Sequence, residues 1–243
     1  MEKSYDFGWS FSALNGHWLV AILLLSVSLG LQLEFPAFWP LWFVTAVFGL
    51  ICFIGGIMLR TTKHLKFALL PFVDVFRSED DMVLDAGCGG GRTTLSILKV
   101  LKKGRVTAFD RFDAYYIEDG GKKQIRNNLE TAGLSDRVDI VQGDLTEMPF
   151  PDSHFDSAVS THVLDHLKDK KKKALEEIYR TLKPGGRFLM VVWVPGWVTF
   201  SLANVFCLFL SNEKEWRKMS RETGFTLRDE GYFNGMYFVV LEK

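Results

Sequence analysis

The hydrophobic and polar positions divide the chain of 243 residues into two regions. Residues 13–33 and 35–59 contain no Asp, Glu, Lys or Arg, and Glu34 stands between them. Each stretch reaches the roughly 20 apolar residues that a helix needs to cross a bilayer. Two adjacent helices that are apolar on every side would need a much larger protein to bury them. The pattern therefore predicts a transmembrane helical hairpin over residues 1–60.

Two other interpretations of this hairpin are a pair of buried core helices and a secretory signal peptide. A signal peptide is disfavoured because residues 1–6 mix acidic residues with one lysine, and a second apolar stretch follows at once. Arg60, Lys63 and Lys66 follow the second stretch, whereas the connection carries only Glu34. The positive-inside rule then places both ends of the hairpin and the C-terminal domain in the cytoplasm.

Residues 80–243 alternate between short apolar runs and segments of helical period. Strands are expected at 81–87, 105–110, 138–144, 155–161 and 187–194, and helices at 92–101, 118–132 and 172–182. Strands that alternate with helices predict right-handed crossovers and a parallel sheet covered on both faces. Residues 226–243 predict an antiparallel edge pair around Asn234-Gly235. Residues 61–79 are expected to be a linker or membrane-surface helix, or the first helix of this domain.

A glycine-rich loop, Gly87 to Gly91, follows the first expected strand and opens a helix. Glycine permits positive φ angles and a close approach of ligand to backbone. Position 92 is not glycine and no Gly-Lys-Ser/Thr follows, so neither the dinucleotide fingerprint nor the P-loop is complete. Asp85, Asp110 and Asp144 stand at the ends of three successive strands. Carboxylates repel phosphate but accept hydrogen bonds from ammonium, ribose hydroxyl and amino groups, which favours a nucleoside with a cationic amino-acid tail.

At these residues the chain resembles the class I S-adenosylmethionine-dependent methyltransferases. The similar segments are VLDAGCGGG, VTAFD, QGDLTEMPFPDSHFDSAVSTHVLDHL and RTLKPGGRFLMVV, which occur in the family's order over residues 80–194. The resemblance implies a Rossmann-like α/β domain over residues 80–243, with a seven-stranded sheet of order 3-2-1-4-5-7-6. It also implies that S-adenosylmethionine binds across the ends of strands one to four. The likeness is greatest to the small-molecule, quinone and lipid methyltransferases.

The resemblance further implies which residues hold the cofactor. Asp85, Gly87, Cys88, Gly89 and Gly91 would lie near its methionine part, Asp110 and Arg111 near the ribose, Asp144 and Leu145 near the adenine, and Thr161 near the sulfonium. The chain departs from the family after Asp110, where residues 111–124 form an insertion. This insertion is either a lid over the cofactor or a longer loop.

The acceptor side of the reaction is less visible in the sequence. Methyl transfer is an in-line displacement on a methyl group that the cofactor activates, so the protein mainly positions the reactants. A general base is needed only if the acceptor must lose a proton. Candidates are His162, Asp165 and His166, which would share one face if this stretch is helical. The alternative is that Asp165 and His166 only cap or pack the helix after the fourth strand. Tyr115, Tyr116, Trp193 and Trp197 are the candidate substrate contacts.

Residues 194–210 form a further uncharged stretch, which Pro195-Gly196 makes too short and broken for a third span. We expect this stretch either to dip into the bilayer and line an access path for a lipophilic acceptor, or to be a buried core helix. The net charge is zero, with 29 basic and 29 acidic residues, so general nucleic-acid binding is not expected. Cys52, Cys88 and Cys207 lack CxxC spacing, which predicts neither a disulfide framework nor a metal site.

Together these features predict an integral membrane methyltransferase that uses S-adenosylmethionine. Its partners would be the lipid bilayer and a small or lipophilic acceptor such as a lipid, a quinone or a hydrophobic small molecule. The alternative is a membrane-tethered S-adenosylmethionine-binding module without turnover, which acts as a regulator or assembly factor. The sequence leaves the oligomeric state open.

Overall fold

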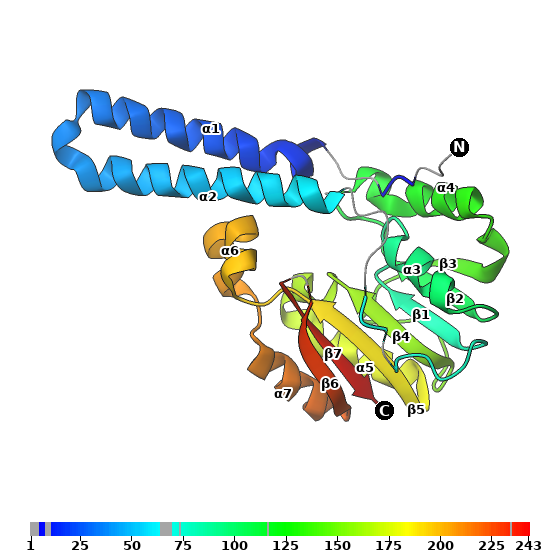
Figure 1. Cartoon of the computed structure of the whole chain (residues 1–243). Helices are drawn as coiled ribbons and strands as arrows, with labels where there is room; N and C mark the ends of the chain where they lie inside the picture. The colour runs from blue at the N-terminus through cyan, green and yellow to red at the C-terminus, as the bar shows by residue number, and fades with distance from the viewer. Residues whose placement is uncertain (1–4, 8–10, 64–69, 73, 116, 234) are drawn as a thin grey trace. The chain divides into compact units, whose positions relative to one another are not determined.

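The chain divides into two compact units (Figure 1). The computed structural model describes residues 5–7, 11–63, 70–72, 74–115, 117–233 and 235–243. The hairpin unit comprises Trp9–Leu65 and Pro195–Leu210, and the sheet unit comprises Met1–Gly8, Lys66–Val194 and Ser211–Lys243. The predicted linker or surface helix over 61–79 falls partly on 64–69 and 73, which lie outside the described residues, so it stays a prediction.

The hairpin unit begins with two antiparallel helices, α1 Phe11–Glu34 and α2 Trp39–Lys63, joined by the 3-10 turn η1 Pro36–Phe38 (Figure 1). Pro40 lies in the first turn of α2, where its missing N–H costs no helical hydrogen bond. Asn15–Glu34 and Pro36–Met58 are long and apolar enough to cross a membrane, and only 11% and 22% of their apolar windows are buried. The two predicted apolar helices are confirmed and are compatible with membrane spans.

Residues 195–210 pack within the same unit as the hairpin. They form α6 Trp197–Ala203 and η6 Asn204–Phe209. A Cβ atom at Gly55 of α2 would overlap the carbonyl oxygen of Ser201, and one at Gly56 would overlap the indole of Trp18 on α1. Glycine is therefore needed at both positions for these helices to approach closely. Small residues at helix contacts are typical of packing in membranes.

The sheet unit is built on a seven-stranded sheet of order β3-β2-β1-β4-β5-β7-β6, as predicted. Its strands are β1 Met82–Ala86, β2 Arg105–Asp110, β3 Val138–Gln142, β4 Phe155–Thr161, β5 Leu182–Val192, β6 Thr226–Phe233 and β7 Met236–Glu242. The first five strands pair in parallel, and β7 is antiparallel to β5 and β6. The predicted antiparallel pair is confirmed, although Asn234 of its turn lies outside the described residues. Because β7 lies between β5 and β6, only β6 of this pair is at the edge.

The helices of the sheet unit follow the predicted alternation, with one addition. They are α3 Arg92–Val100, α4 Lys122–Ala132, α5 Lys171–Thr181 and α7 Glu213–Thr223, with 3-10 turns η2 Glu118–Gly121, η3 Ser135–Arg137, η4 Leu164–His166 and η5 Lys168–Lys170. The sequence did not predict α7, because only Trp216 and Ser220 are buried on it and no apolar stripe forms. Its local signal is a capping box between Asn212 and Glu215.

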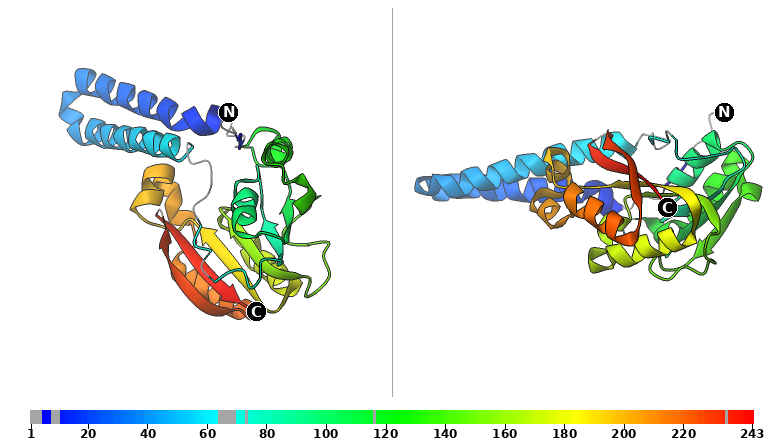
Figure 2. Two further views of the ribbon diagram at one scale, coloured as in Figure 1. Left: turned by 45° about the vertical axis from the view of Figure 1, so that its right-hand side comes forward. Right: turned by 90° about the horizontal axis from the view of Figure 1, so that it is seen from below.

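Successive residues of β1 point into opposite layers of the sheet unit. Leu84 belongs to the core cluster that also contains Ile178 of α5 and Trp216 of α7. Asp85, the next residue, contacts Thr94 of α3 on the other face. Helices therefore cover both faces, as predicted, and α5 and α7 lie together on one of them (Figure 2).

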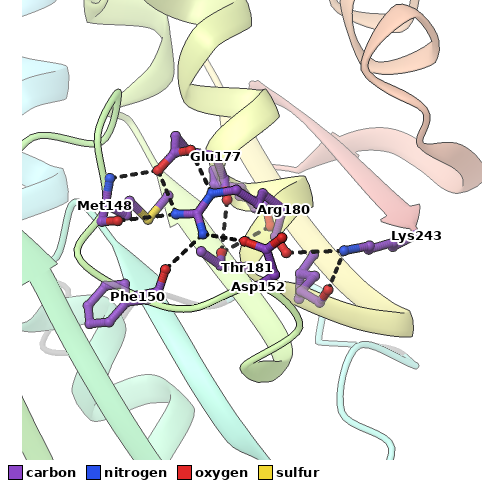
Figure 3. A network of polar contacts seen from close by, with 9 residues as sticks. Met148, Phe150, Asp152, Glu177, Arg180, Thr181 and Lys243 are labelled. Atoms are coloured by element: carbon purple, nitrogen blue, oxygen red, sulfur yellow. Dashed lines mark hydrogen bonds and ion pairs between the residues drawn. The ribbon is translucent and has the colours of Figure 1, made fainter.

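The segment after β3, which contains Asp144, is held by one arginine (Figure 3). Arg180 of α5 donates hydrogen bonds to the carbonyl oxygens of Met148 (3.1 Å) and Phe150 (2.8 Å) and to the carboxylates of Glu177 and Asp152. Glu177 in turn accepts the Met148 N–H at 2.7 Å. Lys243 donates to the carbonyl oxygens of Arg180 and Leu182. The β3–β4 segment is thus fixed to α5, and α5 to the C-terminus.

Candidate cofactor and acceptor site

The carboxyl ends of β1 to β4 meet at one edge of the sheet, which is where parallel α/β sheets bind their ligands. The strand register places Asp85 of β1 beside Ala108 of β2 and Val159 of β4. The glycine-rich loop, Asp110, Asp144 and Thr161 then follow or end these strands. The structure therefore gathers the predicted cofactor-binding residues at this edge.

Asp85 is a fully buried carboxyl group in this site. Its Oδ2 accepts a hydrogen bond of 2.5 Å from Thr94 Oγ1, whereas its buried Oδ1 has no hydrogen-bond partner within the described part of the chain. Burial raises the pKa of Asp85 to about 7; the Thr94 hydrogen bond opposes this shift, and the charge of Asp110 adds to it. A buried carboxylate that lacks a partner is costly, so a cation or a donor placed at Oδ1 would be strongly favoured.

The glycine-rich loop needs glycine for both conformation and space. Gly87 and Gly89 have φ angles of 88° and 48°, a region that side chains other than glycine seldom adopt. A Cβ atom at Gly87 would also overlap the side chain of Val163, which comes from the segment after β4. Gly91 has a φ of 84° and caps the start of α3. Side chains from outside the loop, such as that of Val163, therefore occupy the space that the glycines leave.

Asp110 ties the second strand to this loop. Its Oδ2 accepts the Gly89 N–H at 2.9 Å and its Oδ1 accepts the Phe112 N–H at 2.7 Å. Burial raises the pKa of Asp110, and these two backbone hydrogen bonds oppose that shift. Each carboxylate oxygen can accept a second hydrogen bond, so Asp110 retains capacity for ribose hydroxyls. Arg111 lies 2.8 Å from the Asp113 carboxylate and 3.7 Å from the Asp144 carboxylate.

Asp144, at the third strand, has a different environment. Its Oδ1 accepts hydrogen bonds of 2.8 Å from both the N–H and the hydroxyl of Thr146. The backbone hydrogen bond from Thr146 is the main reason that the pKa of Asp144 is lowered. Leu145, the other residue predicted at the adenine, is buried in the core cluster. This end of the site therefore carries an ionised acid with local partners.

His162 and Trp193 meet beyond the end of β4. Thr161 Oγ1 lies 2.7 Å from Thr93 Oγ1, and the chain then turns at His162, whose φ is 56°. The imidazole stacks on the Trp193 indole, with ring centroids 5.1 Å apart and an interplanar angle of 28°. Burial lowers the pKa of His162, and the nearby charge of Asp165 opposes this. Nδ1 of His162 is buried and has no hydrogen-bond partner among the residues that the structure describes.

The expectation that His162, Asp165 and His166 share one face of an α-helix is wrong. His162 has a left-handed backbone conformation, and Leu164–His166 is a single 3-10 turn. Asp165 is 5% exposed and its Oδ2 accepts the Trp193 N–H at 3.3 Å, whereas His166 is exposed. Asp165 therefore lies on the His162–Trp193 side, and His166 faces the surface.

The predicted substrate contacts belong to different parts of the chain. Tyr115 is 90% exposed, and Tyr116 lies outside the described residues. Trp193 belongs to the sheet unit, whereas Trp197 belongs to the hairpin unit and is 89% exposed. Within the insertion after Asp110, Ile117 packs against Gly89, where a Cβ atom would lie 3.2 Å from its Cδ1. The insertion therefore contacts the glycine-rich loop directly.

Three residues near the loop were not identified from the sequence: Thr94, Asn128 and Phe7. Thr94 and Asn128 are polar side chains on the buried faces of α3 and α4, with 0% and 2% of their surface exposed. A polar residue at an apolar helical position was the available signal for both. Phe7 precedes the first apolar stretch, and no periodicity relates it to the loop.

Comparison with known proteins agrees with this geometry. The family model described as "Methyltransferase domain" matches residues 84–190. The match covers less than half of the chain and indicates a domain similar to that family. The cofactor of this domain is S-adenosylmethionine, and the site fits that molecule, because Asp85 Oδ1 offers a buried acceptor for an ammonium group.

Two curated relatives of the chain are named as methyltransferases of ubiquinone/menaquinone biosynthesis and of a phytyl-hydroquinone. Over 110 residues the chain is 38% identical to the ubiquinone/menaquinone biosynthesis C-methyltransferase UbiE of Psychromonas ingrahamii, covering 45% of this chain and 41% of the relative. Over 197 residues it is 27% identical to the chloroplastic 2-methyl-6-phytyl-1,4-hydroquinone methyltransferase of Spinacia oleracea, covering 80% and 52%. The chain thus spans about half the length of these curated relatives.

The fold of the domain also occurs in solved structures. A SAM-dependent methyltransferase from Methanosarcina mazei superposes with a TM-score of 0.57 at 21% identity, covering 73% of this chain and 99% of that one. At this identity the likeness shows the common fold. Substrate choice depends on the site and not on the fold.

Proposed function

We propose that this protein is an integral membrane S-adenosylmethionine-dependent methyltransferase that transfers a methyl group to a lipophilic acceptor at the cytoplasmic face. The observation that carries the proposal is the buried, unpaired Oδ1 of Asp85 beside a glycine-rich loop. It occurs in a chain with two helices long and apolar enough to span a membrane. Relatives named as a ubiquinone/menaquinone biosynthesis C-methyltransferase and a 2-methyl-6-phytyl-1,4-hydroquinone methyltransferase support the acceptor class.

The residues at the sheet edge would divide the cofactor among them. Asp85 would hold the ammonium group, Asp110 the ribose and Asp144 the adenine amino group. Burial raises the pKa of Asp85 and Asp110, whereas local hydrogen bonds lower that of Asp144. When bound, S-adenosylmethionine supplies a methyl group activated by the positive sulfur. The chain's own contribution is to orient the acceptor in line with that methyl and to exclude water.

His162 is the residue best suited to take a proton from an acceptor hydroxyl or an activated ring. Burial lowers its pKa, so the imidazole is neutral at pH 7 and able to accept a proton. Its Nδ1 has no partner in the described chain, while Trp193 holds the ring from one side. Asp165 would stabilise the resulting imidazolium, since its charge already raises the pKa of His162. An acceptor that loses no proton in the transfer would need only the positioning by His162 and Trp193.

The hairpin unit supports access from a bilayer. Its α6–η6 segment exposes Trp197 (89%), Leu208 (70%) and Phe209 (83%). An apolar hollow of about 370 Å³ lies beside them, lined by Pro195, Gly196, Trp197, Phe200, Cys207 and Leu208. Exposed aromatic and aliphatic side chains next to candidate spans suit the interface region of a membrane. We therefore propose that this segment lies at the cytoplasmic interface and receives the apolar part of the acceptor.

The test uses full-length protein in nanodiscs, methyl-labelled S-adenosylmethionine and an extract of total membrane lipids. Label that appears in the organic phase supports a lipophilic-acceptor methyltransferase, and chromatography of that phase identifies the acceptor. The double variant Trp197→Asp, Phe209→Asp should then lose turnover of the lipid acceptor while it binds the cofactor as tightly as wild type. Saturable cofactor binding without any labelled product would overturn the proposal in favour of a tethered binding module. No binding at all would overturn the assignment of the three acids.

A further inference from the structure

Residues 5–7, which precede the first apolar helix in the sequence, pack against the glycine-rich loop. Asn128 of α4 joins them to it. Its Oδ1 accepts the Asp6 N–H at 3.0 Å, and its Nδ2 donates to the carbonyl oxygens of Asp6 (2.6 Å) and Gly90 (2.9 Å). Only 2% of Asn128 is exposed, so its amide is shielded from bulk water, whereas Asp6 itself is exposed. The amide of Asn128 is thus committed to the contact between residue 6 and the loop.

Phe7 adds a second contact to the same loop. Its carbonyl oxygen lies 2.9 Å from the point where a Cβ atom of Gly90 would stand, so the two backbones touch. The Phe7 ring is 9% exposed, and the Arg92 guanidinium lies 4.7 Å from its centroid. Burial lowers the pKa of Arg92, in keeping with its cover by this segment. Phe7 therefore shields both Gly90 and the first residue of α3.

The loop is consequently held from two sides. Asp110 accepts the N–H of Gly89, and Asn128 donates to the carbonyl of Gly90, the next residue. Gly89 has a positive φ and no side chain to lock its conformation, so outside contacts must do so. A loop already held in one conformation binds its ligand more tightly, because less conformational entropy is lost on binding.

We propose that Asp6, Phe7 and Asn128 form a clamp that positions the glycine-rich loop for the cofactor, so that the segment just before the first membrane helix is part of the cofactor site. Asn128 is the central positioning residue, and Phe7 is the cover. This inference rests on the proposed binding of S-adenosylmethionine at that loop. The clamp extends the proposed function, because it assigns a role to residues outside the methyltransferase motifs.

The clamp is tested by cofactor affinity, measured by calorimetry on the full chain in nanodiscs. Phe7→Ala and Asn128→Leu should each raise the Kd for S-adenosylmethionine about tenfold, a loss comparable to one or two hydrogen bonds. Asn127→Leu is the matched control, because Asn127 is the exposed neighbour on the same helix. Phe7→Ala removes a buried ring and should also lower the cofactor-free melting temperature, so the affinities are compared at a temperature at which every variant is folded.

Hydrogen exchange provides a second measurement, which reports on residue 6 directly and does not depend on turnover. Coupling between binding and the clamp is reciprocal, so saturating cofactor should slow exchange of the Asp6 amide, which donates to Asn128. Wild-type affinity in both variants, or unchanged exchange at residue 6, overturns the clamp while the proposed function stands. If the wild-type chain itself fails to bind the cofactor, the proposed function fails with it.

Discussion

The two ends of the cofactor site use the same side chain in opposite ways. Asp85 at β1 is fully buried with one unpaired oxygen, and burial raises its pKa to about 7. Asp144 at β3 accepts two hydrogen bonds from Thr146, which lower its pKa. The first acid is left for a ligand to satisfy, whereas the second is satisfied by the protein. We infer that the β1 end carries most of the cofactor affinity that depends on charge.

The largest expected effect comes from removing the charge at the β1 end. Asp85→Asn keeps the size of the side chain but cannot pair with an ammonium group. We expect the Kd for S-adenosylmethionine to rise about 100-fold, because a hydrogen bond to a charged group contributes roughly 1.5–3 kcal/mol. The cofactor-free protein should melt at a higher temperature at pH 8, since a costly buried charge is gone. Equal affinity of variant and wild type in calorimetry would remove the distinction between the two acids.

The second-largest effect is expected when the arginine that holds the segment after β3 is removed. Arg180→Leu breaks the contacts that hold the segment after Asp144 and leaves Glu177 without its cation. We expect a loss of about 2–3 kcal/mol in the free energy of unfolding, measured by urea denaturation. Arg221→Leu on α7 is the control, because Arg221 is exposed. A loss no larger than in the control would show that Arg180 does not fix this segment.

The pH dependence separates the two acids without any change in the fold. The folded-state pKa of Asp85 is about 7, above its ordinary value of 3.8, so below pH 7 the carboxyl must release a proton to pair with a cation. Cofactor affinity should fall about tenfold for each pH unit below 7 and stay constant above it. Without cofactor the sign is reversed, because Asp85 contributes stability that is fully present below its ordinary pKa of 3.8 and is lost as the pH rises from there through about 7.

The pH experiment has an internal control. In Asp85→Asn, calorimetry from pH 5.5 to 8.5 should show no change of cofactor affinity near pH 7. A change that persists in this variant would assign the titration to another group, such as His162, whose pKa burial lowers.

The smallest effect is expected at the acid with local partners. Thr146→Val removes the hydroxyl bond to Asp144 but leaves the backbone N–H bond, which is the main cause of its low pKa. The Kd should rise about fivefold, which corresponds to about 1 kcal/mol. The pKa of Asp144, followed by carboxyl NMR, should rise as well. A change as large as that of Asp85→Asn would reverse the proposed division of binding between the two ends.

Much of the fold could be anticipated because it is encoded locally. Alternation of short apolar runs with helical periods indicated the parallel strands, and the family resemblance implied the strand order that the structure confirms. The misses occur where local patterns are weak. Helix α7 buries only Trp216 and Ser220, and the turn after β4 depends on the positive φ of His162, which no periodicity reveals.

The candidate site also has features that the sequence predicts and features that only the structure shows. The sequence by itself determined that acids stand at or near the ends of the first three strands, that a glycine-rich loop follows the first strand and that two uncharged stretches precede the domain. Only the tertiary structure decided that Asp85 keeps an unpaired buried oxygen while Asp144 does not, and that Asp6 meets Asn128, 122 residues away along the chain. The physical reason is that spacing determines which residues share a strand or a face, whereas desolvation and distant contacts depend on how the elements pack.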